Sequence, residues 1–189
     1  MTAAPVFDAT DTRTRLIVAA ATLFRDKGFH GTALSEILER AGASKSSLFH
    51  HFPAGKDDLA LAAAHWADQG TLRIIDDAFA DAPDFGTGCV ILCRKLARFM
   101  EREPGWAGCP VGQILFRASG DGAFRAETAR IFDGWRDRLA AHGARLGVPE
   151  GEAADRAETL LIALQGAWTL ARARRDPGVL RGLMDRLPG

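Results

Sequence analysis

The side chains best suited to binding chemistry lie in one short segment, residues 44–51. Its polar residues are serines, a lysine and two histidines: Ser44, Lys45, Ser46, Ser47, His50 and His51. If the segment is helical, Leu48 and Phe52 face inward, because they lie four residues apart. The outward side chains are then Lys45, Ser46, Ser47 and His50. Their ammonium, hydroxyl and imidazole groups suit base edges and phosphates, so the segment predicts a helix that enters the DNA major groove.

Metal binding and enzyme chemistry are alternatives for the reactive side chains. The adjacent His50 and His51 diverge by about 100° around a helix, so they make a poor chelate, and we expect no metal and no cofactor. Cys109 has no base beside it in the sequence, and a redox role for it stays open. None of the five histidines has a catalytic spacing, so we predict no catalytic residue and no enzyme. A helical adaptor that binds protein is the other competing class.

Two short helices joined by a glycine turn would position the polar segment. Thr32 can cap the first helix, whose apolar residues recur at helical spacing: Leu34, Ile37, Leu38 and Ala41. Gly42 tolerates a positive φ and can end that helix at a tight corner, after which Ser44 caps the second. Upstream, residues 12–27 form an amphipathic helix. The sequence to residue 52 therefore predicts a three-helix unit with the polar helix last.

The residues of this unit also follow the order of a known family. Residues 19–29, 31–32 and 41–52, followed by Lys56, resemble the N-terminal domain of TetR-family transcriptional repressors. Farther along, Gly108-Cys109-Pro110-Val111-Gly112 is a motif carried by one branch of that family. The resemblance is strong over about residues 12–62 and otherwise depends on the helical pattern and that motif.

The resemblance implies a regulator, expected to be a repressor, that binds double-stranded operator DNA. Contacts to the DNA backbone would come mainly from Thr32, Ser44, His51 and Lys56. Phe49 also belongs to the DNA-binding face, at a position where the family usually has Tyr. Because this chain has no Tyr, the phosphate contact that the tyrosine hydroxyl commonly makes is missing.

The charge of the chain is zero overall but unevenly placed. Residues 11–56 hold seven basic and four acidic residues, so the remainder is net negative. A modestly basic head suits contact with phosphates. No apolar run is long enough for a membrane span, and the N-terminus lacks a secretory signal. Three cysteines do not suggest a disulfide framework, so we expect a cytoplasmic protein that binds no membrane.

From Lys56 onward the pattern is helical throughout. We expect helices over about 56–80, 87–102, 122–146, 152–175 and 178–187, with a short one near 114–116. The predicted fold class is all-α, with a three-helix head and a larger helical body. The predicted division is a flexible tail over 1–10, a helix-turn-helix DNA-binding domain over 11–55, and a ligand-binding and dimerisation domain over 56–189.

The helix predicted over 152–175 is apolar nearly all round, so both of its sides need covering. The simplest cover for the second side is the same helix of another copy, which predicts a homodimer. The family resemblance likewise places the two terminal helices in a dimer interface. The predicted interface residues are Ala163, Leu164, Ala167, Leu170, Leu180, Leu183 and Met184.

The helical body also carries many large apolar side chains with polar ones between them. Most are core residues, but as a set they fit an apolar pocket with a few polar anchors. The family resemblance favours a small-molecule effector there, which would release the protein from DNA. The predicted pocket residues are Met100, Trp106, Cys109, Phe116, Trp135, Gln165 and Trp168.

Overall fold

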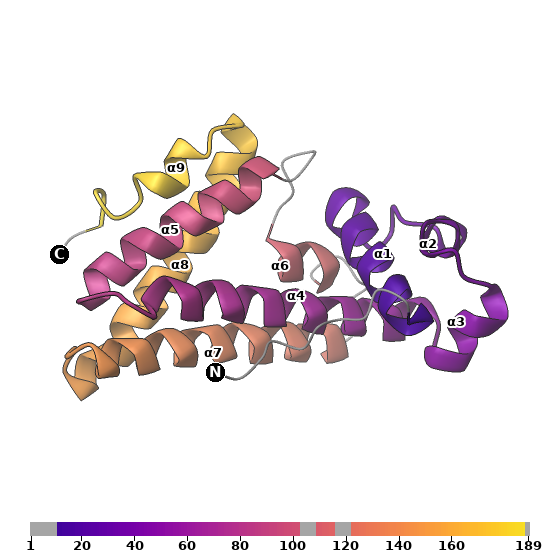
Figure 1. The fold of residues 1–189 in the computed structure, drawn as a ribbon, viewed down its shortest axis with the longest axis horizontal. Helices are drawn as coiled ribbons and strands as arrows, with labels where there is room; N and C mark the ends of the chain where they lie inside the picture. Colours follow the sequence, from indigo (N-terminus) through magenta and orange to yellow (C-terminus); the bar gives the residue numbers. More distant parts are fainter. Residues whose placement is uncertain (1–10, 103–108, 116–121, 188–189) are drawn as a thin grey trace. The chain divides into compact units, whose positions relative to one another are not determined.

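The computed structural model describes residues 11–102, 109–115 and 122–187, which form the all-α fold that the sequence predicts (Figure 1). The helices are α1 Thr12–Lys27, α2 Leu34–Ala41, α3 Lys45–His51, α4 Lys56–Phe79, α5 Phe85–Arg102, α6 Pro110–Leu115, α7 Gly122–Arg145, α8 Glu150–Arg174 and α9 Gly178–Arg181. Among the described residues, no helix has an apolar stretch long enough to cross a membrane.

The contacts between residues divide the chain into two compact units. The first combines Met1–Ala67 with Pro110–Arg125, and the second combines Asp68–Cys109 with Ala126–Gly189. Helices α4 and α7 therefore contribute to both units. The functional division predicted at residue 55, between DNA binding and ligand binding, stays a prediction.

The core of the first unit forms where α1, α2 and α3 pack together. Leu16, Phe24, Ile37 and Leu48 are completely buried there. Helices α2 and α3 have eight and seven residues, which is too short for a stable isolated helix in water. Their stability therefore comes from packing on α1 and on each other.

In the second unit, the C-terminal segment packs against α5 and α8. Arg181 on α9 forms an ion pair with Glu101 near the end of α5, and Leu180 and Leu183 are buried. The predicted helix over 178–187 is wrong beyond Arg181, where α9 ends. Gly182 is its C-cap, and glycine disfavours helix continuation by about 1 kcal/mol relative to alanine.

The start of α5 lies against the end of α4. A Cβ atom on Gly88 would overlap the ring of Phe79, so the approach requires glycine. The Phe79 ring stacks on His142, with 5.0 Å between ring centroids. Near Gly88, Cys89 and Cys93 are fully buried, and burial raises the pKa of their thiols to about 12 and about 11. Both cysteines therefore stay protonated at neutral pH.

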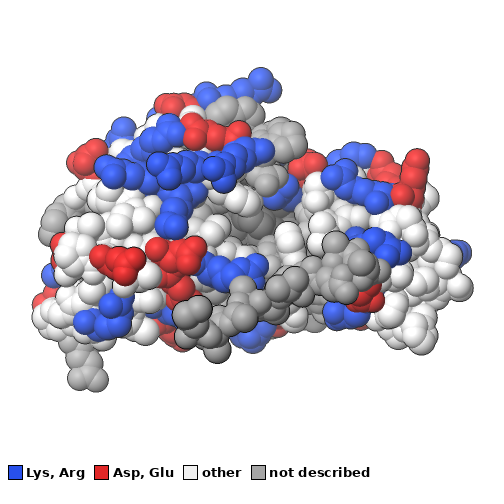
Figure 2. All heavy atoms as spheres, viewed as in Figure 1, with Lys and Arg blue, Asp and Glu red and all other residues white. Residues whose placement is uncertain are grey.

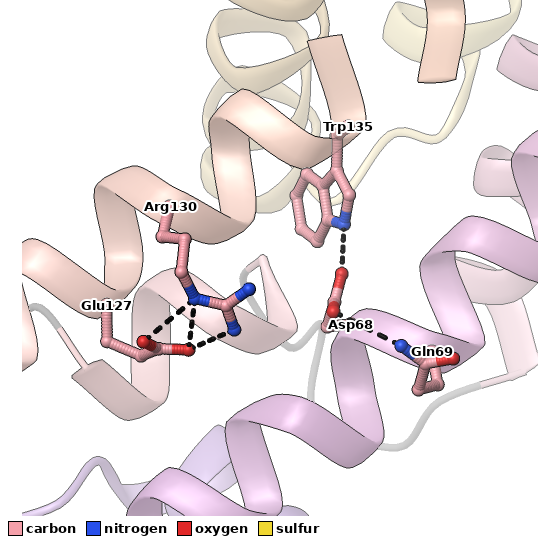
Figure 3. Close-up of polar contacts among 5 residues, drawn as sticks. All are labelled: Asp68, Gln69, Glu127, Arg130 and Trp135. Carbon is pink, nitrogen blue, oxygen red and sulfur yellow. Dashed lines mark hydrogen bonds and ion pairs between the residues drawn. The ribbon is translucent and has the colours of Figure 1, made fainter. Parts of the chain in front are cut away.

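Polar groups join α4 and α7 within the second unit (Figure 3). Asp68 is only 9% exposed, and its Oδ1 accepts a 2.7 Å hydrogen bond from Nε1 of Trp135. About two turns of α4 farther on, Asp76 accepts a 2.8 Å bond from Arg138 and lies 2.9 Å from Nε2 of His142. A buried carboxylate is costly unless it is hydrogen-bonded, so the Trp135 donor offsets the burial of Asp68.

We expect Trp135→Phe to lower the free energy of unfolding by about 1–3 kcal/mol, because Oδ1 of the buried Asp68 loses its 2.7 Å donor, while Gln69 still donates to Oδ2 at 3.5 Å. Urea denaturation at fixed protein concentration measures the change. Adding Asp68→Leu should recover part of the loss, since both polar partners are then gone. The control is Trp66→Phe, whose indole makes no hydrogen bond within the described residues. Equal losses in the two tryptophan variants would contradict the argument.

Candidate nucleic-acid interface

The turn between α2 and α3 is built on the left-handed conformation of Gly42. Its φ is 58° and its ψ is 41°, which a glycine adopts without steric cost. The N–H of Ala43 donates to the carbonyl of Leu38 at 3.0 Å, so this carbonyl in the last turn of α2 has a hydrogen-bond partner. Ser44 then caps α3, because its Oγ accepts the N–H of Ser47 at 3.1 Å. The sequence predicted both the Gly42 corner and the Ser44 cap.

Polar contacts fix α2 against α1 at both ends. Nε of Arg15 donates to the carbonyl of Ala41 at 2.9 Å. At the other end Lys27 forms an ion pair with Glu36, whose second oxygen accepts the N–H of Ala33 at 3.0 Å. The hydrogen bond from Lys27 and then that from Ala33 hold the pKa of Glu36 below its usual range. Sequence reasoning missed Arg15, because its partner lies 26 residues away.

Thr32 has a different role from the predicted helix cap. The residue before α2 is Ala33, and Thr32 is only 1% exposed. Its Oγ1 lies 2.9 Å from the carbonyl of Gly28 and 3.2 Å from that of Leu23. The prediction that Thr32 caps α2 is therefore wrong. Its hydroxyl is engaged with the end of α1, and its predicted contact with the DNA backbone stays a prediction.

Helix α3 separates its buried and outward side chains as predicted from its spacing. Leu48 is fully buried and Phe52 is 3% exposed. On the other side Ser44, Lys45, Ser46 and His50 are exposed, while Ser47 and His51 are half-buried. The outward face therefore offers hydroxyl, ammonium and imidazole groups from one short helix.

Phe49 adds an aromatic surface to the same helix. It is 42% exposed, and Nζ of Lys45 lies 6.0 Å from its ring centroid. The ring also sits against Gly55, where a Cβ atom would come within 3.2 Å of it. Phe49 thus connects α3 to the turn that leads into α4.

Lys56, at the start of α4, is held against aromatic rings of the first unit. Its Nζ lies 4.4 Å from the Phe29 centroid and 6.0 Å from that of Phe24, both within range of a cation–π interaction. Burial lowers the pKa of the Lys56 ammonium, and the charge of Asp57 opposes this shift. The position of this lysine is therefore set by packing as well as by charge.

The predicted effector residues lie in the second unit wherever they are described. Met100, Trp135 and Trp168 are buried, and Gln165 and Cys109 are half-buried. Ring contacts hold two of them, since Trp135 lies against Phe132 at 5.1 Å and Trp168 against Phe99 at 6.1 Å. Trp106 and Phe116 fall outside the described residues.

The second unit also contains a cavity of about 370 Å³ that the sequence did not predict. Its apolar wall is formed by Phe85, Cys89, Leu160, Met184 and Leu187. Its polar residues are Asp155, Arg156 and Thr159. None of the predicted effector residues lines it. Within the described ranges, no three His, Cys, Asp or Glu side chains group as metal ligands would.

The predicted dimer-interface residues of α8 and the C-terminal segment differ in their exposure within the single chain. Leu164, Ala167, Leu180 and Leu183 are buried within the single chain. Ala163 and Met184 are half-buried. Leu170 is exposed, at 46%. Ile162, two turns earlier on α8, is also exposed, at 64%. Sequence reasoning missed Ile162, although Ile162, Gly166 and Leu170 follow one another at intervals of four residues.

Comparisons with known proteins agree with this architecture. A family profile described as "Bacterial regulatory proteins, tetR family" matches residues 16–63. A second, "Transcriptional regulator LmrA/YxaF-like, C-terminal domain", matches residues 87–186. An HTH-type transcriptional regulator of Mycobacterium tuberculosis is 32% identical over 174 residues, which cover 87% of this chain and 86% of that protein.

Two solved structures share the fold. A TetR regulatory protein from Rhodobacter sphaeroides is 25% identical and has a TM-score of 0.80, covering 92% of this chain and 95% of that one. The TetR-family regulator CifR, solved as a cysteine mutant with 26-bp operator DNA, is 22% identical with a TM-score of 0.75, covering 93% and 94%. With both family profiles matched along one chain, the protein belongs to the TetR family and is a DNA-binding transcriptional regulator, not an enzyme.

Proposed function

We propose that this regulator is a cytoplasmic repressor that binds a near-palindromic operator as a homodimer and leaves it when a small apolar or aromatic effector binds. The observation that carries the proposal is the outward face of α3, where Lys45, Ser46 and His50 are exposed while Leu48 anchors the helix in the core. A polar helix presented by a glycine turn is how helix-turn-helix proteins read the major groove.

The proposed contacts divide by their reach from α3. Lys45, Ser46, Ser47 and His50 contact base edges or the phosphates beside them. Ser44, His51 and Lys56 contact the backbone, and Phe49 packs against the sugar and phosphate surface without a hydroxyl to donate. For Thr32 we propose a supporting role through its bonds to the end of α1.

The exposed face of α8 supports the homodimer. Ile162 and Leu170 are two of the four large hydrophobic side chains that are exposed among the described residues. Gly166 lies between them, and a Cβ atom there would touch nothing in the chain. A second α8 could therefore approach closely and cover both apolar side chains. A two-fold dimer presents two α3 helices, which accounts for a near-palindromic operator.

The body of the second unit supports the effector. Met100, Trp135 and Trp168 supply apolar and aromatic surface, and Gln165 is a half-buried polar group on α8. The Asp68 carboxylate, which accepts the indole N–H of Trp135, is a second polar group (Figure 3). An effector that binds the DNA-free arrangement more tightly than the DNA-bound one shifts the equilibrium toward release.

We expect Lys45→Ala to weaken binding to all duplex sequences and to reduce the slope of log affinity against log salt by about 1, because one phosphate contact is lost. Fluorescence anisotropy with DNA from the gene's neighbourhood gives the slope. Arg138→Ala is the control, since it removes one positive charge from a side chain that pairs with Asp76 at 2.8 Å in the second unit. If the slopes of Lys45→Ala and wild type agree, Lys45 does not contact phosphate.

We expect Leu170→Glu to weaken dimerisation on the order of a hundredfold, because a carboxylate would lose its hydration in the interface. Sedimentation equilibrium measures the change. The matched control is Val18→Glu, an equally polar change at a 38% exposed apolar residue of α1. A wild-type chain that is monomeric at micromolar concentration would exclude the homodimer.

Effector binding and operator binding should weaken each other by the same factor, about 5–150-fold, because allosteric coupling is reciprocal. Aromatic compounds that release the protein from DNA are the test ligands. Methyl-labelled methionine locates them, since the three methionines are Met1, Met100 and Met184. A shift of the Met100 signal supports the predicted pocket, and a shift of only the Met184 signal places the effector in the 370 Å³ cavity. Equal effector affinity with and without operator rules out this mechanism.

A further inference from the structure

A second concentration of positive charge lies in the second unit. Residues 94–102 and 172–186 together hold nine basic and three acidic residues, a larger surplus than that of residues 11–56. Figure 2 shows lysine and arginine side chains gathered in a band over α5 and α9. We define the α5 basic surface as Arg94, Lys95, Arg98, Arg102, Arg181 and Arg186. Recognition by α3 uses none of these residues, and neither does the proposed contact between two α8 helices.

The arginines of α5 are spaced so that their charges reinforce one another. Arg94, Arg98 and Arg102 are four residues apart and exposed, so they share one face of the helix. Like charges at this spacing destabilise a helix. Arg102 lies in the last turn, where the helix dipole favours a cation. Arg94 and Arg98 lie in the middle of α5 and have no such compensation.

The described acidic side chains near this surface pair with Lys95 and Arg181 but not with Arg94 or Arg98. Lys95 pairs with Asp77 at 3.8 Å, and Glu101 pairs with Arg181. Within the described part of the chain, Arg94 and Arg98 form no ion pair. The surface therefore keeps a net positive charge in a protein whose total charge is zero.

The surface has the features of a site for a polyanion. The large hydrophobic side chains that are exposed among the described residues lie on α1, α3 and α8, and none lies on α5 or α9. Protein interfaces usually centre on apolar or aromatic anchors, and interfacial membrane helices insert an apolar face. A partner that binds through charge alone fits better. Four residues of helix rise about 6 Å, close to the axial rise of about 6.8 Å over two nucleotides of one DNA strand.

We propose that the α5 basic surface binds the phosphates of duplex DNA outside the segment contacted by α3. The contact is independent of sequence, because arginine–phosphate pairs carry no base information. It adds to the DNA contacts of the helix-turn-helix and needs neither the effector nor a repressor role. A regulator of this kind would hold a second stretch of DNA through its body.

The test is the double variant Arg94→Gln/Arg98→Gln of the full chain, measured by anisotropy against a long random-sequence duplex. We expect affinity at low salt to fall about three- to tenfold and the salt slope to decrease by roughly 1–2, as expected for lost phosphate contacts. The matched control is Arg136→Gln/Arg156→Gln, which removes the same charge from arginines that are ion-paired on α7 and α8. The control should keep the wild-type slope.

A second measurement locates the contact without a variant. Phenylglyoxal modifies accessible arginines, and mass spectrometry should show that duplex DNA protects Arg94 and Arg98 but not Arg136. The proposal is overturned if the two double variants have equal slopes while Lys45→Ala lowers its own, since α3 alone then accounts for DNA binding. It is also overturned if Arg94→Gln/Arg98→Gln loses binding only to phosphatidylserine vesicles, because the surface then belongs to a membrane.

Discussion

The orientation of α3 depends on the burial of a few of its side chains against neighbouring helices, because α3 is too short to be stable on its own. With seven residues, α3 has too few backbone hydrogen bonds to be stable in water. Leu48 and Phe52 hold it against the core, and this burial decides which side chains face outward. The Gly42 corner and the bond from Arg15 to Ala41 then fix where α2 ends. Any DNA contact made by α3 therefore depends on the packing of α1, α2 and α3 that holds this helix in place.

The first unit could be predicted from sequence because most of its signals are local. The Ser44 cap, the Gly42 corner and the four-residue spacing from Leu48 to Phe52 involve neighbours along the chain. Thr32 was wrongly predicted as the cap of α2, because tertiary packing determines the hydrogen-bond partners of its hydroxyl. A threonine before a helix is a good cap by type, but here its hydroxyl is buried against the carbonyls of Leu23 and Gly28. Residue type alone cannot distinguish these two environments.

In the second unit the helices could be predicted from sequence, but the side-chain contacts between them could not. Helix α8 is apolar on most of its circumference, so its pattern could not show which side faces the chain's own core. Leu164 and Ala167 take that side, and Ile162 and Leu170 remain outside. The hydrogen bond between Trp135 and Asp68 joins two residues that are 67 positions apart in the sequence, so no local sequence pattern predicts it. The helix predicted over 178–187 failed at Gly182, where intrinsic propensity prevailed over amphipathic spacing.

The alkylation of the buried thiols of α5 can report local unfolding of that helix. Cys89 and Cys93 are shielded from solvent, and burial raises their pKa to about 12 and about 11. Alkylating reagents attack the thiolate, so they react with Cys93 only when α5 opens to water, whereas Cys89 also lines the cavity of the second unit. The rate at which the Cys93 sulfur is alkylated then measures local unfolding of the second unit, free of any signal from the helix-turn-helix.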